Sequence, residues 1–241
     1  MARTFIAKSR TTHTHAHTHT HTQTPPHKHK QLTVNQQRYS DYIRRPDSKI
    51  VIGVGAAGSG KTYIPCAIGI EHLINKKVSK ILITRPAVSL DEEHGFLPGK
   101  LEDKMLPYMK PIYDCFLKYV SMDTLRSYLK NETIEICPLS FIRGRTFENC
   151  FMIADETQNT TISQMRTLLT RIGEDCKVVV TGDLSQTDLP SSPMNGLADL
   201  LDRREKLFET SDESCIDVVH FGDRDVVRSE IVKKVIHMYS L

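Results

Sequence analysis

The feature that most constrains the fold of this chain is one glycine-rich octapeptide, Gly55-Ala56-Ala57-Gly58-Ser59-Gly60-Lys61-Thr62. It matches the phosphate-binding pattern G-x-x-x-x-G-K-[ST] at every fixed position. An apolar run (50–54) precedes it and a helical pattern (63–73) follows it, as the pattern requires. Small residues let successive backbone N–H groups turn inward around phosphate oxygens, at the positive end of the following helix. The sequence therefore predicts a binding site for a nucleoside triphosphate.

The last two residues of this loop carry the side chains expected to act on the nucleotide. Lys61 is expected to reach the β- and γ-phosphates, and the Thr62 hydroxyl is expected to ligate Mg²⁺. The alternative is an ordinary glycine-rich turn between a strand and a helix. The complete pattern, with both flanks in place, argues against that alternative.

The net charge of +3 is unevenly distributed along the 241 residues. Residues 1–46 contain eight Lys/Arg and one acidic residue, whereas the remainder contains 24 Lys/Arg and 28 acidic residues. Any general attraction to nucleic acid therefore has to come from the N-terminal segment or from local patches.

Cysteine usage and apolar runs indicate a soluble protein of a reducing compartment. The six cysteines are widely spaced and form no C-x-x-C pair, which argues against a disulfide framework or a zinc ribbon. No apolar run approaches the roughly 18 residues that a membrane-spanning helix needs, and residues 1–10 lack the apolar core of a secretory signal. We therefore expect a cytoplasmic protein without a membrane partner.

Residues 1–30 form a His/Thr-rich tail with a histidine at every second position from His13 to His21. In an extended chain these side chains share one face and could chelate Zn²⁺, Cu²⁺ or Ni²⁺. We favour a disordered, low-complexity tract without a selected ligand. A targeting peptide is a third interpretation, which the lack of an amphipathic helical period weakens. The folded domain is expected to span residues 31–241.

Beyond the tail, apolar runs alternate with helical patterns, which predicts a three-layer α/β domain with a mostly parallel central sheet. The expected strands are 49–55, 80–85, 134–137, 150–155, 178–182 and 217–221. The expected helices are 63–73, 108–120, 161–171, 196–207 and 226–239, with loops and short helices over 86–110. Ligands of such sheets lie at the carboxyl ends of the strands.

Two consecutive acids end the apolar strand at 150–155. Asp155 stands where phosphate-loop enzymes hold Mg²⁺ beside the Thr62 hydroxyl. Glu156 can polarise a water for in-line attack on the γ-phosphorus, as a general base. An apolar strand that ends in Asp-Glu is also common as a solvated turn, so the motif gains its weight from the phosphate loop. The pair favours a hydrolase over a small-molecule kinase.

The strand at 178–182 ends in a second polar segment. Asp183 places a carboxylate at the strand tip, and Gln186 is long enough to contact a γ-phosphate or the attacking water. Gln186 is therefore a candidate sensor of the phosphate. The alternative is a turn in which Gly182 and Asp183 serve the chain reversal.

Together these segments resemble the PhoH family, ATP-binding proteins related to the first motor domain of superfamily-one helicases. The resemblance begins near residue 32 and rests on GVGAAGSGKT (53–62), TRPAVSLDEEHGFLPGKLEDKMLPYMKPIYD (84–114), PLSFIRGRTFENCFMIADETQNTTISQMRTLLTRIG (138–173), VVTGDLSQTDLP (179–190) and DVVRSEIVKKVIHMY (225–239). It implies a helicase-like P-loop NTPase fold, ATP and Mg²⁺ as ligands, and ATP hydrolysis as the activity.

By resemblance, four side chains belong to helicase-like motifs: Asp155, Glu156, Asp183 and Gln186. The segment that ends at Gln36 resembles an upstream motif whose glutamine reads the adenine amino edge, which would select ATP. Thr157 stands where the family commonly has alanine, a small change that leaves both acids intact. Some relatives carry an N-terminal PIN-type nuclease domain, and no nuclease is expected here.

Helicase motors complete each ATP site with arginines from a second domain, and this sequence offers one such domain. A second subunit could supply the arginine in trans, a contribution of ~10³–10⁵ in rate. The candidates are Arg143, Arg145, Arg171 and Arg228, with Arg145 preferred because the RGRT segment carries the resemblance. We therefore expect a head-to-tail homo-oligomer, such as a hexameric ring, with nucleotide sites between subunits.

The leading functional hypothesis is an ATPase that acts on RNA or other single-stranded nucleic acid. The acidic body and the lack of an aromatic-rich basic patch give little support to the nucleic-acid part. The alternative is a nucleotide-binding regulatory or stress-associated protein with little turnover. A GTPase is disfavoured because residues 75–78 fail the guanine motif Asn-Lys-x-Asp at its last position.

Overall fold

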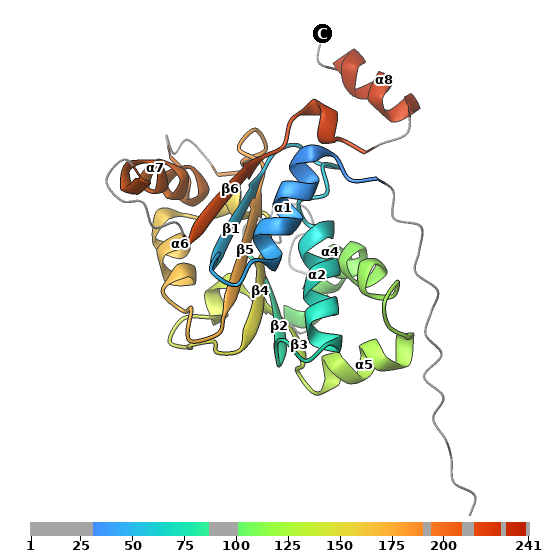
Figure 1. Ribbon diagram of the computed structural model, residues 1–241, viewed down its shortest axis with the longest axis vertical. Coiled ribbons are helices and arrows are strands. Elements are labelled where there is room, and N and C mark those ends of the chain that lie inside the picture. The colour runs from blue at the N-terminus through green and yellow to red at the C-terminus, as the bar shows by residue number, and fades with distance from the viewer. Residues whose placement is uncertain (1–30, 87–100, 190–193, 209–214, 228–229, 240–241) are drawn as a thin grey trace, which may run out of the picture.

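The computed structural model describes residues 31–86, 101–189, 194–208, 215–227 and 230–239. At its centre is a six-stranded sheet of order β3-β2-β4-β5-β1-β6, in which every neighbouring pair is parallel (Figure 1). The strands are β1 (Ile50–Val54), β2 (Lys80–Arg85), β3 (Ile134–Pro138), β4 (Cys150–Ala154), β5 (Lys177–Gly182) and β6 (Ile216–His220). The predicted α/β fold with a parallel sheet is confirmed.

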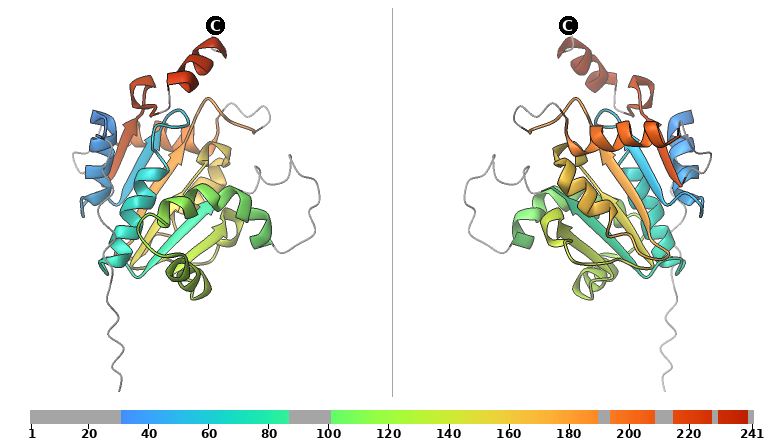
Figure 2. Two further views of the ribbon diagram at one scale, coloured as in Figure 1. Left: turned by 90° about the vertical axis from the view of Figure 1, so that its right-hand side faces the viewer. Right: turned by 90° about the vertical axis from the view of Figure 1, so that its left-hand side faces the viewer.

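Helices cover both faces of the sheet (Figures 1 and 2). One face packs against α1 (Val34–Arg44), α2 (Tyr63–Ile74), α4 (Leu101–Phe116) and α5 (Met122–Lys130). The other face packs against α6 (Ile162–Leu169) and α7 (Gly196–Phe208). Three short 3₁₀ turns follow strands: η1 (Leu139–Phe141), η2 (Thr157–Asn159) and η3 (Asp223–Asp225). Helix α8 (Glu230–Tyr239) stands beyond the sheet (Figure 1).

The alternation of side chains along each strand divides the apolar core into two parts. On β4, Phe151 and Ile153 pack under α2, whereas Met152 packs under α6 and α7. All three side chains are fully buried. A strand covered on both faces needs apolar residues at every position, which explains the continuous apolar runs in the sequence.

The same alternation places three polar residues on the α2 side, where β2, β4 and β5 end. Thr84 lies opposite Ala154, and Ala154 lies opposite Val180. The residues that follow Thr84, Ala154 and Val180 are Arg85, Asp155 and Thr181, which therefore lie at the same level of the sheet. Side chains two residues apart on a strand lie on the same face, so these three lie on the face whose buried residues pack against α2.

Two helices were not predicted, and one is longer than predicted. Thr33 and Gln36 form a capping box at the start of α1, and the Ser121 side chain accepts a hydrogen bond from the Thr124 N–H at the start of α5. Helix α4 begins at Leu101, seven residues before the predicted start, and passes through Pro107, where loops and short helices were expected, and through Pro111. Burial of its later apolar side chains outweighs the poor helix propensity of proline.

The described helices also bear on membrane contact. None of those in the described part of the chain combines the length and the apolar character needed to cross a bilayer.

Candidate active site

The phosphate loop connects β1 to α2, and two of its carbonyls are held by groups outside the loop. The carbonyl of Gly58 accepts from the Val227 N–H at 3.0 Å, and the carbonyl of Ser59 accepts from Gln36 Nε2 at 2.9 Å. Six N–H groups of the loop have no acceptor among the described residues, namely those of Ala56, Ala57, Gly58, Gly60, Lys61 and Thr62. A loop with paired carbonyls and unpaired N–H groups is a concave anion site.

Glycine is required at two points of this loop. Gly58 and Gly60 have φ angles of +88° and +89°, in the left-handed region that residues with a Cβ rarely adopt. Gly60 is a fixed position of the motif, so its left-handed backbone explains the glycine there.

Lys61 lies between Gly60 and Thr62, just before α2. Its side chain is buried, and its ammonium group makes no hydrogen bond or ion pair with any residue that the structure describes. The phenol of Tyr39 donates to the Lys61 carbonyl at 3.1 Å, which anchors the backbone there. A buried cation without a counter-charge is costly, so this geometry favours an anionic ligand.

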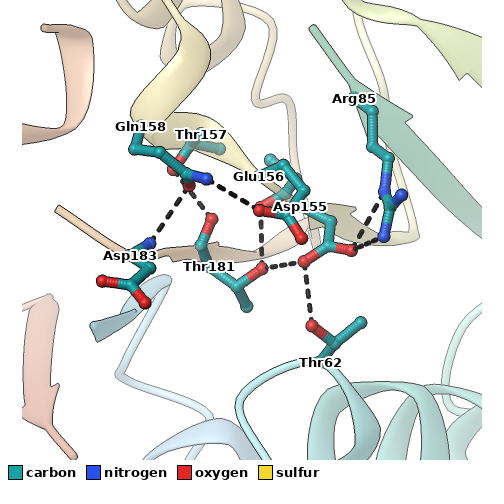
Figure 3. A network of polar contacts seen from close by, with 9 residues as sticks. Thr62, Arg85, Asp155, Glu156, Thr157, Gln158, Thr181 and Asp183 are labelled. Carbon is teal, nitrogen blue, oxygen red and sulfur yellow. Dashed lines mark hydrogen bonds and ion pairs between the residues drawn. The ribbon is translucent and has the colours of Figure 1, made fainter. Parts of the chain in front are cut away.

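Asp155 is the centre of a polar network at the end of β4 (Figure 3). Its Oδ1 accepts from the hydroxyls of Thr62, at 2.9 Å, and Thr181. Its Oδ2 accepts from Arg85, with the Nε atom at 3.0 Å. The phosphate loop and the acid that the sequence predicted as metal ligands are therefore in direct contact.

The electrostatics of Asp155 follow from this network. Burial of the fully enclosed carboxyl group raises its pKa. The Arg85 charge and the hydrogen bonds from Thr181, Arg85 and Thr62 outweigh burial and hold the pKa of Asp155 below its usual value. The carboxylate is thus ionised at neutral pH and can attract a divalent cation.

Glu156 leaves the strand in a left-handed conformation, with φ of 55° and ψ of 39°. Such a backbone costs of order 1–3 kcal/mol for a residue with a side chain and persists where neighbours fix it. Here the side chain is half-buried, and its Oε2 accepts from Gln158 Nε2 at 2.8 Å. Figure 3 shows both acids side by side, each with its own partners.

Asp183 and Gln186 lie on the loop after β5 and differ in exposure. Asp183 is buried, and its Oδ1 accepts from the Ser185 N–H at 3.0 Å and the Ser185 hydroxyl at 2.7 Å. Its Oδ2 is buried and has no hydrogen-bond partner among the described residues, so it can accept a hydrogen bond from a ligand or a water. Gln186 is exposed, and its backbone N–H donates to the Asp183 carbonyl at 3.1 Å. The sensor role of Gln186 stays a prediction.

Gln36, the residue for which the resemblance implied an adenine contact, makes three hydrogen bonds within the protein. Its amide N–H groups donate to the carbonyls of Ser59, at 2.9 Å, and Asp225, at 3.0 Å. Its Oε1 accepts from the Thr33 N–H at 3.1 Å, and the residue is buried. Both amide N–H groups are used by backbone carbonyls, and one lone pair of Oε1 remains for a further donor. Gln36 thus holds the phosphate loop, and its contact with adenine stays a prediction.

Two of the candidate arginines, Arg145 and Arg171, make their contacts away from the phosphate loop of their own chain. Arg145 pairs with Glu135 of β3, with Nη2 2.9 Å from Oε2, and stacks over the Phe147 ring at 4.5 Å. Three strands separate β3 from β1 in the sheet. Arg171 donates to the Arg145 carbonyl at 3.3 Å, and Arg143 is exposed. The fourth candidate, Arg228, lies outside the described residues.

Sequence reasoning missed three side chains of the network: Arg85, Thr181 and Gln158. Arg85 and Thr181 lie where apolar strands end, and their parity with the buried face could have indicated them. The strand order that brings β2 beside β4 could not be read from the sequence. No sequence signal pointed to Gln158.

The histidine-rich tail, for which metal chelation was the disfavoured alternative, falls in residues 1–30, outside the described residues. In the rest of the chain that the structure covers, no group of three or more His, Cys, Asp or Glu side chains is arranged to hold a metal ion. A site for Mg²⁺ that also uses phosphate oxygens needs fewer protein ligands than such a group supplies.

Comparisons with known proteins identify relatives of this chain. The sequence profile of the family described as "PhoH-like protein" matches residues 28–240. Protein PhoH of Escherichia coli K12 is 41% identical over 202 residues, which are 83% of this chain and 55% of that protein. The PhoH-like protein of Bacillus subtilis 168 is 39% identical over 207 residues, which are 86% of this chain and 62% of that protein. The chain thus spans somewhat more than half the length of these relatives.

A solved structure resembles the fold. The large terminase of a thermophilic bacteriophage superposes with a TM-score of 0.52 at 13% identity, over 86% of this chain and 50% of the terminase. At that identity the likeness shows the fold alone. The fold is that of a P-loop NTPase, and the family match covers the phosphate loop, the acid pair and the loop after β5. The chain belongs to the PhoH family.

Proposed function

We propose that this chain is an ATPase that hydrolyses ATP with Mg²⁺ at the carboxyl ends of β1, β4 and β5. The observation that carries the proposal is the contact between Thr62 of the phosphate loop and Asp155, at 2.9 Å, with Glu156 as the next residue. A phosphate-binding loop, a metal-ligand pair and a candidate base thus share one small volume. Binding alone would not need the second acid.

Each group has a distinct task in the proposed reaction. The unpaired N–H groups of the loop and the Lys61 ammonium bind the β- and γ-phosphates. Thr62 and Asp155 would hold Mg²⁺, which when bound neutralises charge on the phosphate oxygens. Glu156 accepts a proton from the attacking water, a role that contributes typically 10²–10⁴-fold. Its left-handed backbone aims the carboxylate beside Asp155 rather than along the strand.

The proposal extends to an assembled form that acts on single-stranded nucleic acid. A neighbouring copy would supply a cation to the γ-phosphate in trans. Arg145 is the proposed residue, and it would first have to leave Glu135. Light scattering in Mg²⁺-ATP, together with phosphate release under the same conditions, tests whether the protein assembles. A strictly monomeric protein with full turnover would contradict the proposed assembly.

Steady-state phosphate release tests the hydrolysis directly. Wild type should turn over in Mg²⁺-ATP and lose activity on chelation, and Lys61→Ala should lose tight ATP binding. Stimulation by single-stranded RNA in wild type alone would support coupling to nucleic acid. Binding of ATP without turnover in wild type would reject the hydrolase and favour the regulatory alternative.

A further inference from the structure

One buried amide connects the proposed base to the loop after β5. Gln158, on η2, is 2% exposed. Its Nε2 donates to Glu156 Oε2 at 2.8 Å, and its Oε1 accepts from the Asp183 N–H at 3.1 Å (Figure 3). The same side chain therefore touches the residue that would activate water and the loop that carries Asp183 and Gln186.

The orientation of this amide is fixed by its partners. A carboxylate such as Glu156 only accepts hydrogen bonds, and a backbone N–H only donates them. The amide nitrogen must therefore face Glu156 and the amide oxygen must face Asp183. A flipped amide would leave both of these contacts unsatisfied.

The surroundings of Gln158 hold it in place. The hydroxyl of Thr157 donates to the Thr181 carbonyl at 2.9 Å, which fixes η2 against the end of β5. A Cβ atom at Gly182 would lie 2.9 Å from Gln158 Oε1, so the glycine allows the amide to approach the strand closely. The amide is thus clamped between two backbone segments and the Glu156 carboxylate.

We propose that Gln158 is a positioning residue that sets the Glu156 carboxylate and transmits movements of the loop 183–188 to it. The inference rests on the proposed ATPase function. Gln158 leaves Glu156 Oε1 to face the water and restrains Oε2. A shift of the loop on γ-phosphate contact would then move the amide and, with it, the Glu156 carboxylate. Misplacement by about 1 Å can cost 10²-fold in rate.

The next residue on the same turn offers a matched control. Asn159 is also 2% exposed, and its Nδ2 donates to Asp188 Oδ2 at 2.7 Å while its Oδ1 accepts from the Asp188 N–H at 2.9 Å. It therefore clamps the same loop with the same pair of bonds, but its carboxylate partner is Asp188 instead of Glu156. Amide-to-acid substitution at either position keeps the acceptor, removes the donor and sets two carboxylates against each other.

Steady-state kinetics of Gln158→Glu and Asn159→Asp test the proposal. Gln158→Glu should lower kcat by about 10–100-fold and leave the KM for ATP within about threefold, because the phosphate loop is untouched. Asn159→Asp should lower kcat by less than Gln158→Glu does, because Gln158 still holds Glu156 in that variant. An unchanged or increased kcat in Gln158→Glu, or an equal loss in both variants, would overturn the proposal.

A reversed pair tests the contact without turnover. In Glu156→Gln/Gln158→Glu the new amide can donate to the new carboxylate, so the urea midpoint should recover most of the loss seen in Gln158→Glu. The kcat of the double variant should be no lower than that of Glu156→Gln alone. A midpoint that does not recover would overturn the inference. Absence of turnover in wild type would instead reject the proposed ATPase function, and the midpoints would still decide whether the contact exists.

Discussion

Replacing Arg85 with methionine removes the cation that neutralises the buried Asp155 carboxylate. Asp155 is 0% exposed, and both donors to its Oδ2 come from Arg85. A hydrogen bond to a charged group is worth about 1.5–3 kcal/mol, and breaking a buried pair costs about 3–5 kcal/mol. The variant keeps the hydroxyl donors of Thr62 and Thr181 on Oδ1. We therefore expect a loss of about 3–5 kcal/mol in the free energy of unfolding.

Urea unfolding at pH 7 measures this loss, with Arg126→Met as the control. Arg126 pairs with Asp123 on the surface, where the two side chains are 72% and 93% exposed. Such a pair contributes at most about 1 kcal/mol. A loss for Arg85→Met as small as that for Arg126→Met would refute the assignment of Arg85 as the counter-charge.

The pH dependence of the same variant gives a second reading. In wild type the folded-state pKa of Asp155 lies below the unfolded value of 3.8. Its contribution to stability is therefore complete above about pH 4 and is lost as the pH falls through the folded-state pKa. Without Arg85, burial becomes the dominant influence and raises the pKa of Asp155. The deficit of Arg85→Met should then shrink as the pH falls from 7 to 5, and a constant deficit would contradict the argument.

Two further substitutions probe the core and the strand end. Burial, with the nearby charges of Lys77 and Arg44, lowers the pKa of His72 from 6.5 to about 4. The contribution of the neutral imidazole to the free energy of unfolding is therefore complete above pH 6.5 and is lost as the pH falls from 6.5 to 4. The unfolding free energy of wild type should fall by about 1–2 kcal/mol more than that of His72→Phe between pH 7 and 4.5, allowing for partial solvation; equal slopes in urea titrations would contradict this. A Cβ at Gly182 would lie 2.5 Å from a Leu197 methyl group, so Gly182→Ala should lower the thermal midpoint by an amount equivalent to about 1–3 kcal/mol. An unchanged thermal midpoint in calorimetry would contradict this, because it would mean that α7 moves away from the added Cβ without cost.

The sheet and the phosphate loop could be predicted because their signals are local. The apolar runs before Gly55 and Asp155 are long enough to be strands buried on both faces, and the octapeptide has a fixed backbone requirement. Helix α1 also had a local signal, since Thr33 and Gln36 have the spacing of a capping box.

The rest of the site depends on features that the sequence does not carry. Arg85 reaches Asp155 only because β2 lies beside β4 in the sheet, although 64 residues separate the two strands along the chain. Gln158 reaches Glu156 because Glu156 adopts a left-handed backbone, which a glutamate rarely does. Strand order and one unusual backbone angle were therefore the missing information.

Single-turnover hydrolysis of ATP by Glu156→Gln tests the central claim most directly. With Mg²⁺ and enzyme in excess, the variant should bind ATP with wild-type affinity, because the loop, Lys61, Thr62 and Asp155 are intact. The rate of the chemical step should fall by about 10²–10⁴-fold, as expected for loss of a general base. Equal chemical rates in the variant and in wild type would contradict the assignment of Glu156 and, with it, the proposed mechanism of hydrolysis.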